Sequence, residues 1–200
     1  MLYPENVPVS ESALLVIDAQ DSFKFGARWD RRNNLQFEEN VAALIAAYRA
    51  AKLPIVYFLH TDEDEAFRID SPLFKLMDFI TPEPNEPVFI KSTRNCFTST
   101  PLLPHLLSLG VRRLTISGIQ MEQCCETTTR VGADLGFAAD FVTEATMTFP
   151  IPNFDRPGEE LGVDAIRERT EYALRRRFAR ISTVARITAE LNKETAVLVS

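Results

Sequence analysis

Three side chains that can take part in acid–base or nucleophilic chemistry lie at the ends of apolar segments. Asp18 ends LLVID, Lys91 ends VFIK, and Cys124 follows LTISGIQ. A carboxylate in dry surroundings is costly unless it is paired, and a lysine ammonium can pair with an anion. Each residue alone also has an ordinary explanation. Asp18 can cap the next loop, Lys91 can be an exposed strand end, and Cys124 can be a small apolar side chain.

Helix geometry separates the two adjacent cysteines. Cys125 shares a helical stripe with Met121 and Gly132, so it is predicted to be a core thiol. Cys124 is turned by about 100° from that stripe and lies in the first turn, where free amides and the helix dipole favour a thiolate. We therefore expect Cys124 to be the candidate nucleophile, with a pKa that a nearby lysine lowers further.

The remaining candidates give weaker signals. Cys96 lies in a polar loop and is predicted to pack as a small side chain. The two histidines, His60 and His105, make a weak metal site, to which His60 and Asp62 could contribute two ligands. The chain has no Walker A or G-x-G-x-x-G loop. We therefore expect no metal, no nucleotide and no other cofactor.

The elements that position these residues follow a regular alternation. Strand-length apolar segments alternate with segments of helical period, which is typical of a parallel sheet buried on both faces. Strands are predicted at 13–19, 54–60, 87–91, 112–118, 138–145 and 181–185, and helices at 35–52, 100–110, 121–136, 164–180 and the C-terminal end. The predicted fold class is α/β, a three-layer α/β/α sandwich with a six-stranded parallel sheet, in one domain of residues 1–200 whose core spans about 12–191. Sites in such folds form beyond the carboxyl ends of the strands, where His60 and Glu144 are also predicted to lie.

Composition narrows the class of partner. The net charge of -6 argues against nucleic acid and anionic membrane surfaces. No apolar run approaches the roughly 20 residues that span a bilayer, and the first residues show no signal-peptide pattern. We expect a cytoplasmic protein without a membrane or nucleic-acid partner, acting on a small-molecule substrate.

The three segments together resemble the signature blocks of the isochorismatase-like cysteine hydrolase superfamily. Its members include nicotinamidases, N-carbamoylsarcosine and ureidoacrylate amidohydrolases, and isochorismatase itself. The resemblance covers about 12–191 and lies in the order and spacing of residues 14–23, 89–100 and 114–137. The matching positions are Asp18, Gln20 and Phe23, then Lys91, Phe97, Thr100 and Leu102, then Gly118, Ile119, Glu122, Cys124 and Thr128.

This resemblance implies a catalytic triad of Asp18, Lys91 and Cys124. The aspartate would take the thiol proton, the lysine would stabilise the ion pair, and the thiolate would attack a carbonyl to form a thioester that water hydrolyses. The backbone amides of Gln120 and Cys124 would hold the oxyanion, beside a cis peptide between Ile119 and Gln120. The resemblance also implies a homo-oligomer, a dimer or larger.

Two departures from the family pattern concern the substrate. Met121 stands where threonine is usual, and the segment after His60 lacks the D-x-H…H metal ligands of nicotinamidases, which argues against that activity. The cysteine favours hydrolysis of a C–N bond in an amide, ureide or carbamoyl compound. The alternatives are vinyl-ether hydrolysis, since isochorismatases can lack the cysteine, and a relative that binds a small molecule without catalysis.

Substrate-binding residues are predicted on the loops 23–34, 61–70 and 148–158. Phe23 and Trp29 are candidates for an apolar wall, and Arg28 or Arg94 for binding a substrate carboxylate. The alternative is that these arginines are solvated.

Overall fold

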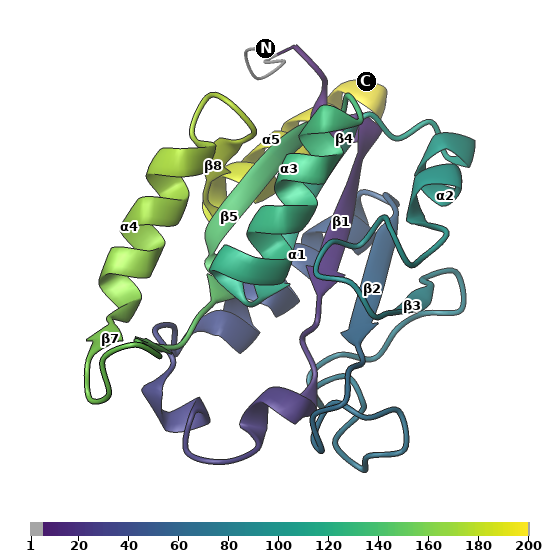
Figure 1. The fold of residues 1–200 in the computed structure, drawn as a ribbon. Coiled ribbons are helices and arrows are strands. Elements are labelled where there is room, and N and C mark those ends of the chain that lie inside the picture. Colours follow the sequence, from purple (N-terminus) through teal and green to yellow (C-terminus); the bar gives the residue numbers. More distant parts are fainter. Residues whose placement is uncertain (1–5, 200) are drawn as a thin grey trace.

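Six parallel strands form the central sheet of the protein (Figure 1). The computed structural model describes residues 6–199, with side chains as far as residue 194. In their order across the sheet, the strands are β3 (Val88–Lys91), β2 (Ile55–His60), β1 (Ser12–Ile17), β4 (Arg113–Ile119), β5 (Ala138–Met147) and β8 (Arg180–Ser182). The predicted α/β class and six-stranded sheet are confirmed.

Helices cover both faces of the sheet. Helices α1 (Phe37–Ala50) and α5 (Val184–Val199) lie on one face, and α2 (Leu102–Ser108), α3 (Glu126–Asp134) and α4 (Val163–Leu174) lie on the other (Figure 1). Side chains alternate along β1, so Leu14 packs in the core under α1 while Leu15 packs in the core under α2 and α3. This burial on both faces explains why the strands are continuously apolar. None of the described helices is long and apolar enough to cross a membrane.

The order of the strands in the sheet indicates a ligand site at its centre. The chain starts at β1 in the middle, moves outward to β2 and β3, and then returns to β4 on the other side of β1. Ligand sites of open α/β sheets lie at such reversals, beyond the carboxyl ends of the strands. These ends lie at the lower edge of Figure 1, opposite the two chain termini.

The structure differs from the predicted elements in several places. A β-bulge between Ile116 and Gly118 shifts the pairing of β4 with β5, and β5 continues to Met147. The proline-containing loop forms a small antiparallel hairpin, β6 (Ile151–Pro152) with β7 (Glu160–Leu161). Helix α4 ends at Leu174, before the predicted residue 180, because Arg176 takes a left-handed φ of 63° that turns the chain into β8.

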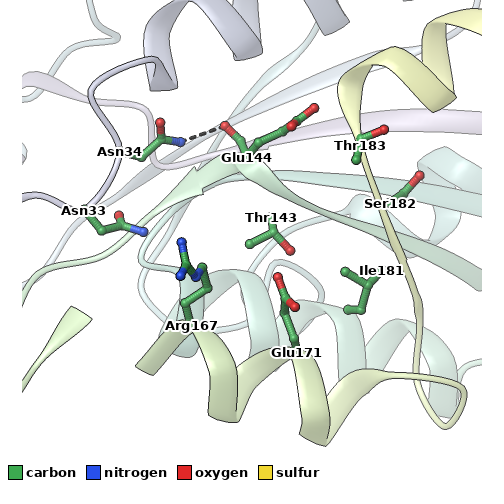
Figure 2. Close-up of a pocket in the computed structure, with 9 residues that line it drawn as sticks. All are labelled: Asn33, Asn34, Thr143, Glu144, Arg167, Glu171, Ile181, Ser182 and Thr183. Carbon is green, nitrogen blue, oxygen red and sulfur yellow. Dashed lines mark hydrogen bonds between the residues drawn. The ribbon is translucent and has the colours of Figure 1, made fainter. Parts of the chain in front are cut away.

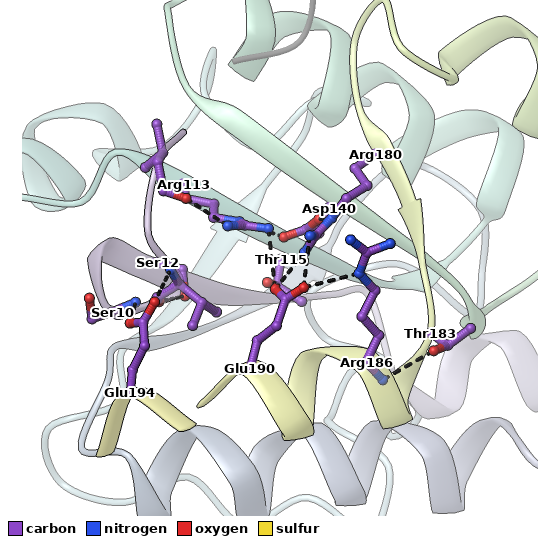
Figure 3. A network of polar contacts seen from close by, with 12 residues as sticks. Ser10, Ser12, Arg113, Thr115, Asp140, Arg180, Thr183, Arg186, Glu190 and Glu194 are labelled. Atoms are coloured by element: carbon purple, nitrogen blue, oxygen red, sulfur yellow. Dashed lines mark hydrogen bonds and ion pairs between the residues drawn. The ribbon is translucent and has the colours of Figure 1, made fainter. Parts of the chain in front are cut away.

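An ion network joins the amino ends of β4, β5 and β8 (Figure 3). The fully buried Asp140 carboxylate accepts from Arg113 at 2.6 Å and from Arg180 at 2.5 Å. Arg180 also donates to both carboxylate oxygens of Glu190 on α5, at 2.8 and 2.7 Å. The network lies at the end of the sheet opposite the predicted site, so we assign it a structural role.

Candidate active site

The side chains of Asp18, Lys91 and Cys124 meet beyond the carboxyl ends of the central strands. The Lys91 ammonium lies 2.8 Å from Asp18 Oδ2 and 3.4 Å from Cys124 Sγ. Asp18 and Lys91 are fully buried, and only 4% of Cys124 is exposed. The buried lysine contradicts the alternative of an exposed strand end. Its carboxylate partner offsets the cost of removing both charges from water.

Backbone features at the ends of β1 and β4 bring these groups together. A Cβ atom at Gly118 would lie 1.9 Å from the carbonyl oxygen of Ile17, and Gly118 has a φ of +124°. Only glycine therefore lets β4 approach β1 so closely just before the site. Asp18 follows Ile17 with a left-handed φ of 50°, a conformation more common for aspartate than for most residues.

The nucleophile turn follows β4 directly. The peptide between Ile119 and Gln120 is cis, and Met121–Cys125 forms one π-helical turn before α3, where the sequence predicts a regular α-helix. The Gln120 carbonyl accepts from the amides of Gln123 and Cys125, at 3.2 and 3.1 Å. Cys125 is fully buried in the core, as predicted. The amides of Gln120 and Cys124 belong to this turn, and their contact with an oxyanion stays a prediction.

Two polar side chains fix neighbouring segments around the triad. Gln20 accepts from the His60 amide at 2.6 Å and donates to the His60 carbonyl at 3.1 Å, which ties the chain after β1 to the end of β2. Thr128, one turn beyond Cys124, accepts from the Cys96 amide at 3.1 Å. The loop after β3 is thereby held against α3, and Cys96 is fully buried, as predicted.

The charge states follow from burial and neighbouring charges. Burial and the adjacent Asp18 carboxylate raise the pKa of Cys124 to about 12, although Lys91 acts in the opposite direction. The prediction of a lowered pKa is therefore wrong for the free protein, because dry surroundings and an anion outweigh the lysine. Burial lowers the pKa of Lys91, but Asp18 and Cys124 outweigh this effect and raise it. The resting site thus holds a neutral thiol beside a carboxylate–ammonium pair.

The Asp18 carboxylate is placed to accept the thiol proton. A side-chain hydrogen bond with Asp18 contributes to the raised pKa of the Cys124 thiol, and apart from this contact and the ion pair with Lys91 the carboxylate oxygens have no partner among the described residues. A buried carboxylate with unused acceptor positions next to a thiol has the arrangement of a general base and nucleophile.

Known proteins are similar to this chain in sequence. A model of the isochorismatase domain matches residues 12–188. The isochorismatase family protein YrdC of Bacillus subtilis is 27% identical over 141 residues, which are 70% of this chain and 75% of YrdC. Ureidoacrylate amidohydrolase RutB of Enterobacter sp. (strain 638) is 28% identical over 171 residues, 68% of this chain and 74% of RutB. This chain belongs to the isochorismatase family.

A solved structure supports the same assignment. The crystal structure of an isochorismatase-family protein from Chromobacterium violaceum has a TM-score of 0.82 at 26% identity and covers 92% of this chain and 95% of that chain. This chain is therefore an isochorismatase-family hydrolase with the family fold.

The residues predicted to bind the substrate of this isochorismatase-family hydrolase lie among aromatic side chains. Phe23 packs with Phe67 at 5.0 Å and with Phe149 at 6.0 Å between ring centroids. Trp29 instead lies under Arg32, whose guanidinium carbon is 4.7 Å from the ring centroid. Trp29 also packs against the core cluster that contains Phe23, and the role of the two side chains as a substrate wall stays a prediction. Phe67 and Phe149 occur on predicted substrate loops, but their pairing with Phe23 has no local sequence signal.

The two candidate arginines differ in their contacts: Arg94 contacts His60, whereas Arg28 lies over aromatic rings. Arg94 approaches His60 Nε2 at 2.6 Å, and Lys91 approaches His60 Nδ1 at 3.3 Å. Arg28 lies over the rings of Phe23, Phe67 and Phe149, and the Phe67 ring contacts the His60 ring edge to face at 6.1 Å. Burial and Lys91 lower the pKa of His60, so its ring is neutral at pH 7. The sequence gives no local signal for the contact between His60 and Lys91, because the two residues end different strands.

Some hollows of the described part of the chain are lined by residues other than the triad. Figure 2 shows one of about 500 Å³ lined by Asn33, Asn34, Thr143, Glu144, Arg167, Glu171, Ile181, Ser182 and Thr183. Glu144 was predicted at the end of the fifth strand, but β5 continues past it and its carboxylate accepts from the first amide of α5, that of Val184. Another hollow, of about 520 Å³, is lined by Thr61, Asp62, Glu63, Arg68, Ile69 and Asp70. Nowhere in the described part of the chain do three histidine, cysteine or acidic side chains form a group able to hold a metal ion.

Proposed function

We propose that this protein is a cysteine hydrolase that cleaves a C–N bond in a small amide, ureide or carbamoyl compound through a thioester. One observation carries the proposal: a fully buried lysine lies 2.8 Å from a buried carboxylate and 3.4 Å from a buried thiol. A structural ion pair needs no thiol, whereas a thiol nucleophile is activated by a neighbouring base or cation, and Cys124 has one of each.

The mechanism starts from the neutral thiol. The Asp18 carboxylate takes the Cys124 proton as sulfur attacks the substrate carbonyl carbon, and Lys91 stabilises the negative charge on sulfur as it forms. The protonated Asp18 then gives this proton to the leaving nitrogen as the C–N bond breaks, which leaves a thioester on Cys124. Water attacks the thioester while Asp18 accepts a proton from it, and Asp18 returns this proton to the Cys124 sulfur as the C–S bond breaks, which releases the acid product and restores the resting site.

The similarity to a ureidoacrylate amidohydrolase supports a C–N bond as the target. The family name also covers ether hydrolysis, in which Asp18 would act without a thiol nucleophile. The two reactions differ in their need for Cys124, and this difference sets the experiment.

The test is hydrolysis of a panel of small amides, ureides and carbamoyl acids, together with a vinyl ether of the isochorismate type. We expect ammonia release by the wild type, and an acyl adduct on the Cys124 peptide in rapidly quenched samples analysed by mass spectrometry. Cys124→Ala should abolish both signals, while the matched control Cys125→Ala retains them. Ether cleavage that survives in Cys124→Ala would favour the alternative, and binding without turnover of any panel member would contradict hydrolysis.

A further inference from the structure

Four groups approach the Lys91 ammonium, which has only three N–H donors. Asp18 Oδ2 lies at 2.8 Å, the Thr93 carbonyl oxygen at 3.2 Å, His60 Nδ1 at 3.3 Å and Cys124 Sγ at 3.4 Å. Lys91 is fully buried, so bulk water does not compete for these positions. At any one time, one of the four groups is therefore without an N–H of Lys91.

The two most distant groups, His60 and Cys124, compete for the third N–H of Lys91. The sulfur of a neutral thiol is a weak acceptor, whereas the unprotonated nitrogen of a neutral imidazole is a good one. Burial and Lys91 lower the pKa of His60, so its ring is neutral at pH 7. In the resting site the third N–H therefore binds His60 Nδ1 instead of the Cys124 sulfur.

The second nitrogen of the His60 ring decides whether this hydrogen bond forms. Nδ1 accepts only when the ring proton is on Nε2, and the Asp62 carboxylate, 3.3 Å from Nε2, is placed to accept from it. Arg94, which approaches Nε2 at 2.6 Å, then meets a second donor. With the proton on Nδ1, the ring would instead present an N–H to the Lys91 cation. Because Arg94 is exposed and can turn to water, whereas Lys91 is fully buried, the proton on Nε2 costs less free energy.

The His60 ring has a fixed place beside Lys91. Gln20 binds both the backbone amide and the carbonyl of His60, at 2.6 and 3.1 Å. The Phe67 ring packs against the imidazole at 6.1 Å between centroids, and His60 is only 3% exposed. The imidazole therefore stays within reach of the Lys91 ammonium when the charge on the sulfur changes.

Resting on the proposed function, in which Cys124 is the nucleophile, we propose that His60 is a positioning residue that acts on Cys124 through Lys91. In the free protein, His60 Nδ1 holds the third N–H of Lys91 and so withholds this hydrogen bond from the sulfur. As Asp18 takes the thiol proton, the sulfur becomes an anion and a stronger acceptor, and the N–H moves from His60 to Cys124. His60 thereby opposes ionisation of the thiol until the carbonyl carbon is attacked.

The test is the rate of iodoacetamide labelling of Cys124 at pH 8 in three variants of His60. His60→Asn puts an amide oxygen near the position of Nδ1, His60→Gln puts its amide near that of Nε2, and His60→Leu has no acceptor. We expect labelling about threefold faster than in the wild type for His60→Leu and His60→Gln, and the wild-type rate for His60→Asn. Loss of the competing hydrogen bond raises the thiolate fraction about tenfold, and the nucleophilicity of the less basic thiolate falls about threefold.

Two controls separate this effect from a loss of structure. Labelling of the fully buried Cys125 reports opening of the fold, and it should stay at the wild-type rate. His105→Leu replaces the other histidine, which packs on Phe89 at 5.7 Å between ring centroids, and it should leave the labelling of Cys124 unchanged. A merely structural role of His60 would give the same rate for His60→Asn and His60→Gln.

The position of the ring proton is measured in the wild-type protein, so it does not depend on the folding of a variant. Long-range ¹H–¹⁵N NMR of protein labelled with ¹⁵N-histidine should show the His60 proton on Nε2 at pH 7, and His105→Gln assigns the signals. A proton on Nδ1 would overturn the inference. So would labelling of Cys124 that is no faster in His60→Leu than in the wild type, or equally fast in His60→Asn and His60→Gln.

Hydrolysis of the amide panel, measured in parallel, separates this inference from the proposed function, because labelling with iodoacetamide needs no substrate. If the labelling rates follow the expected order but no amide is hydrolysed, the control of the thiol by His60 holds and the proposed function fails. If amides are hydrolysed but Cys124 is labelled no faster in His60→Leu, the inference alone is overturned.

Discussion

The charge on Asp18 should have opposite effects on the ionisation of Cys124 and on catalysis. In Asp18→Asn, the carboxylate that raises the pKa of Cys124 is removed while Lys91 remains 3.4 Å from the sulfur. The thiol should therefore ionise more readily and react faster with iodoacetamide. Hydrolysis should nevertheless be lost, because no group remains to accept and return the proton.

The size of the expected change in the alkylation rate follows from the pKa of Cys124. With a pKa of about 12, Cys124 is ionised in roughly one molecule in ten thousand at pH 8. A neighbouring unit charge shifts a buried pKa by about 2, so Asp18→Asn should raise the thiolate fraction about 100-fold. Thiolate nucleophilicity falls as the pKa falls, by about tenfold over 2 units. The alkylation rate should therefore rise about tenfold, and by the same reasoning Lys91→Met should lower it about tenfold.

The assay is iodoacetamide labelling at pH 8, followed by peptide mass spectrometry. Cys125 is an internal control for opening of the fold, because it is fully buried one residue away. Asp21→Asn is the matched variant, since Asp21 is 6% exposed but pairs with Lys24 and Lys75 instead of Lys91. Slower labelling of Cys124 in Asp18→Asn, with Cys125 unchanged, would refute the argument that this carboxylate opposes thiol ionisation.

Two further predictions concern stability and are checked by chemical denaturation. Gly118→Ala brings a methyl group into contact with the backbone of β1 and should cost at least about 3 kcal/mol. Gly162→Ala, with open space and a φ of -70° at the N-cap of α4, should lower the free energy of unfolding by no more than about 1 kcal/mol. Equal changes in the free energy of unfolding for the two variants would contradict the close contact between Gly118 and the backbone of β1. Asp140→Asn leaves the Arg113 and Arg180 charges without their buried counter-ion and should lower the free energy of unfolding by about 3 kcal/mol at pH 7. An unchanged free energy of unfolding would show that water reaches this network.

Strand and helix periodicity was sufficient to predict the sheet, because strands buried on both faces must be apolar along their whole length. The topological rule for parallel sheets then selected Asp18, Lys91 and the start of the nucleophile helix as neighbours. Helical spacing also separated Cys124 from the core thiol Cys125. These inferences depend on local pattern, which the sequence displays directly.

Only the tertiary structure decided the ionisation of Cys124 and the surroundings of Arg28. The thiol pKa depends on the balance between burial, Asp18 and Lys91, whose distances are set by strands far apart in the chain. The rings of Phe67 and Phe149 reach Phe23 from separate loops, while Trp29, which is near in sequence, turns to Arg32. Residue types and spacing determined which groups meet, but the distances and the exclusion of water that set their charges arise only when the layers pack.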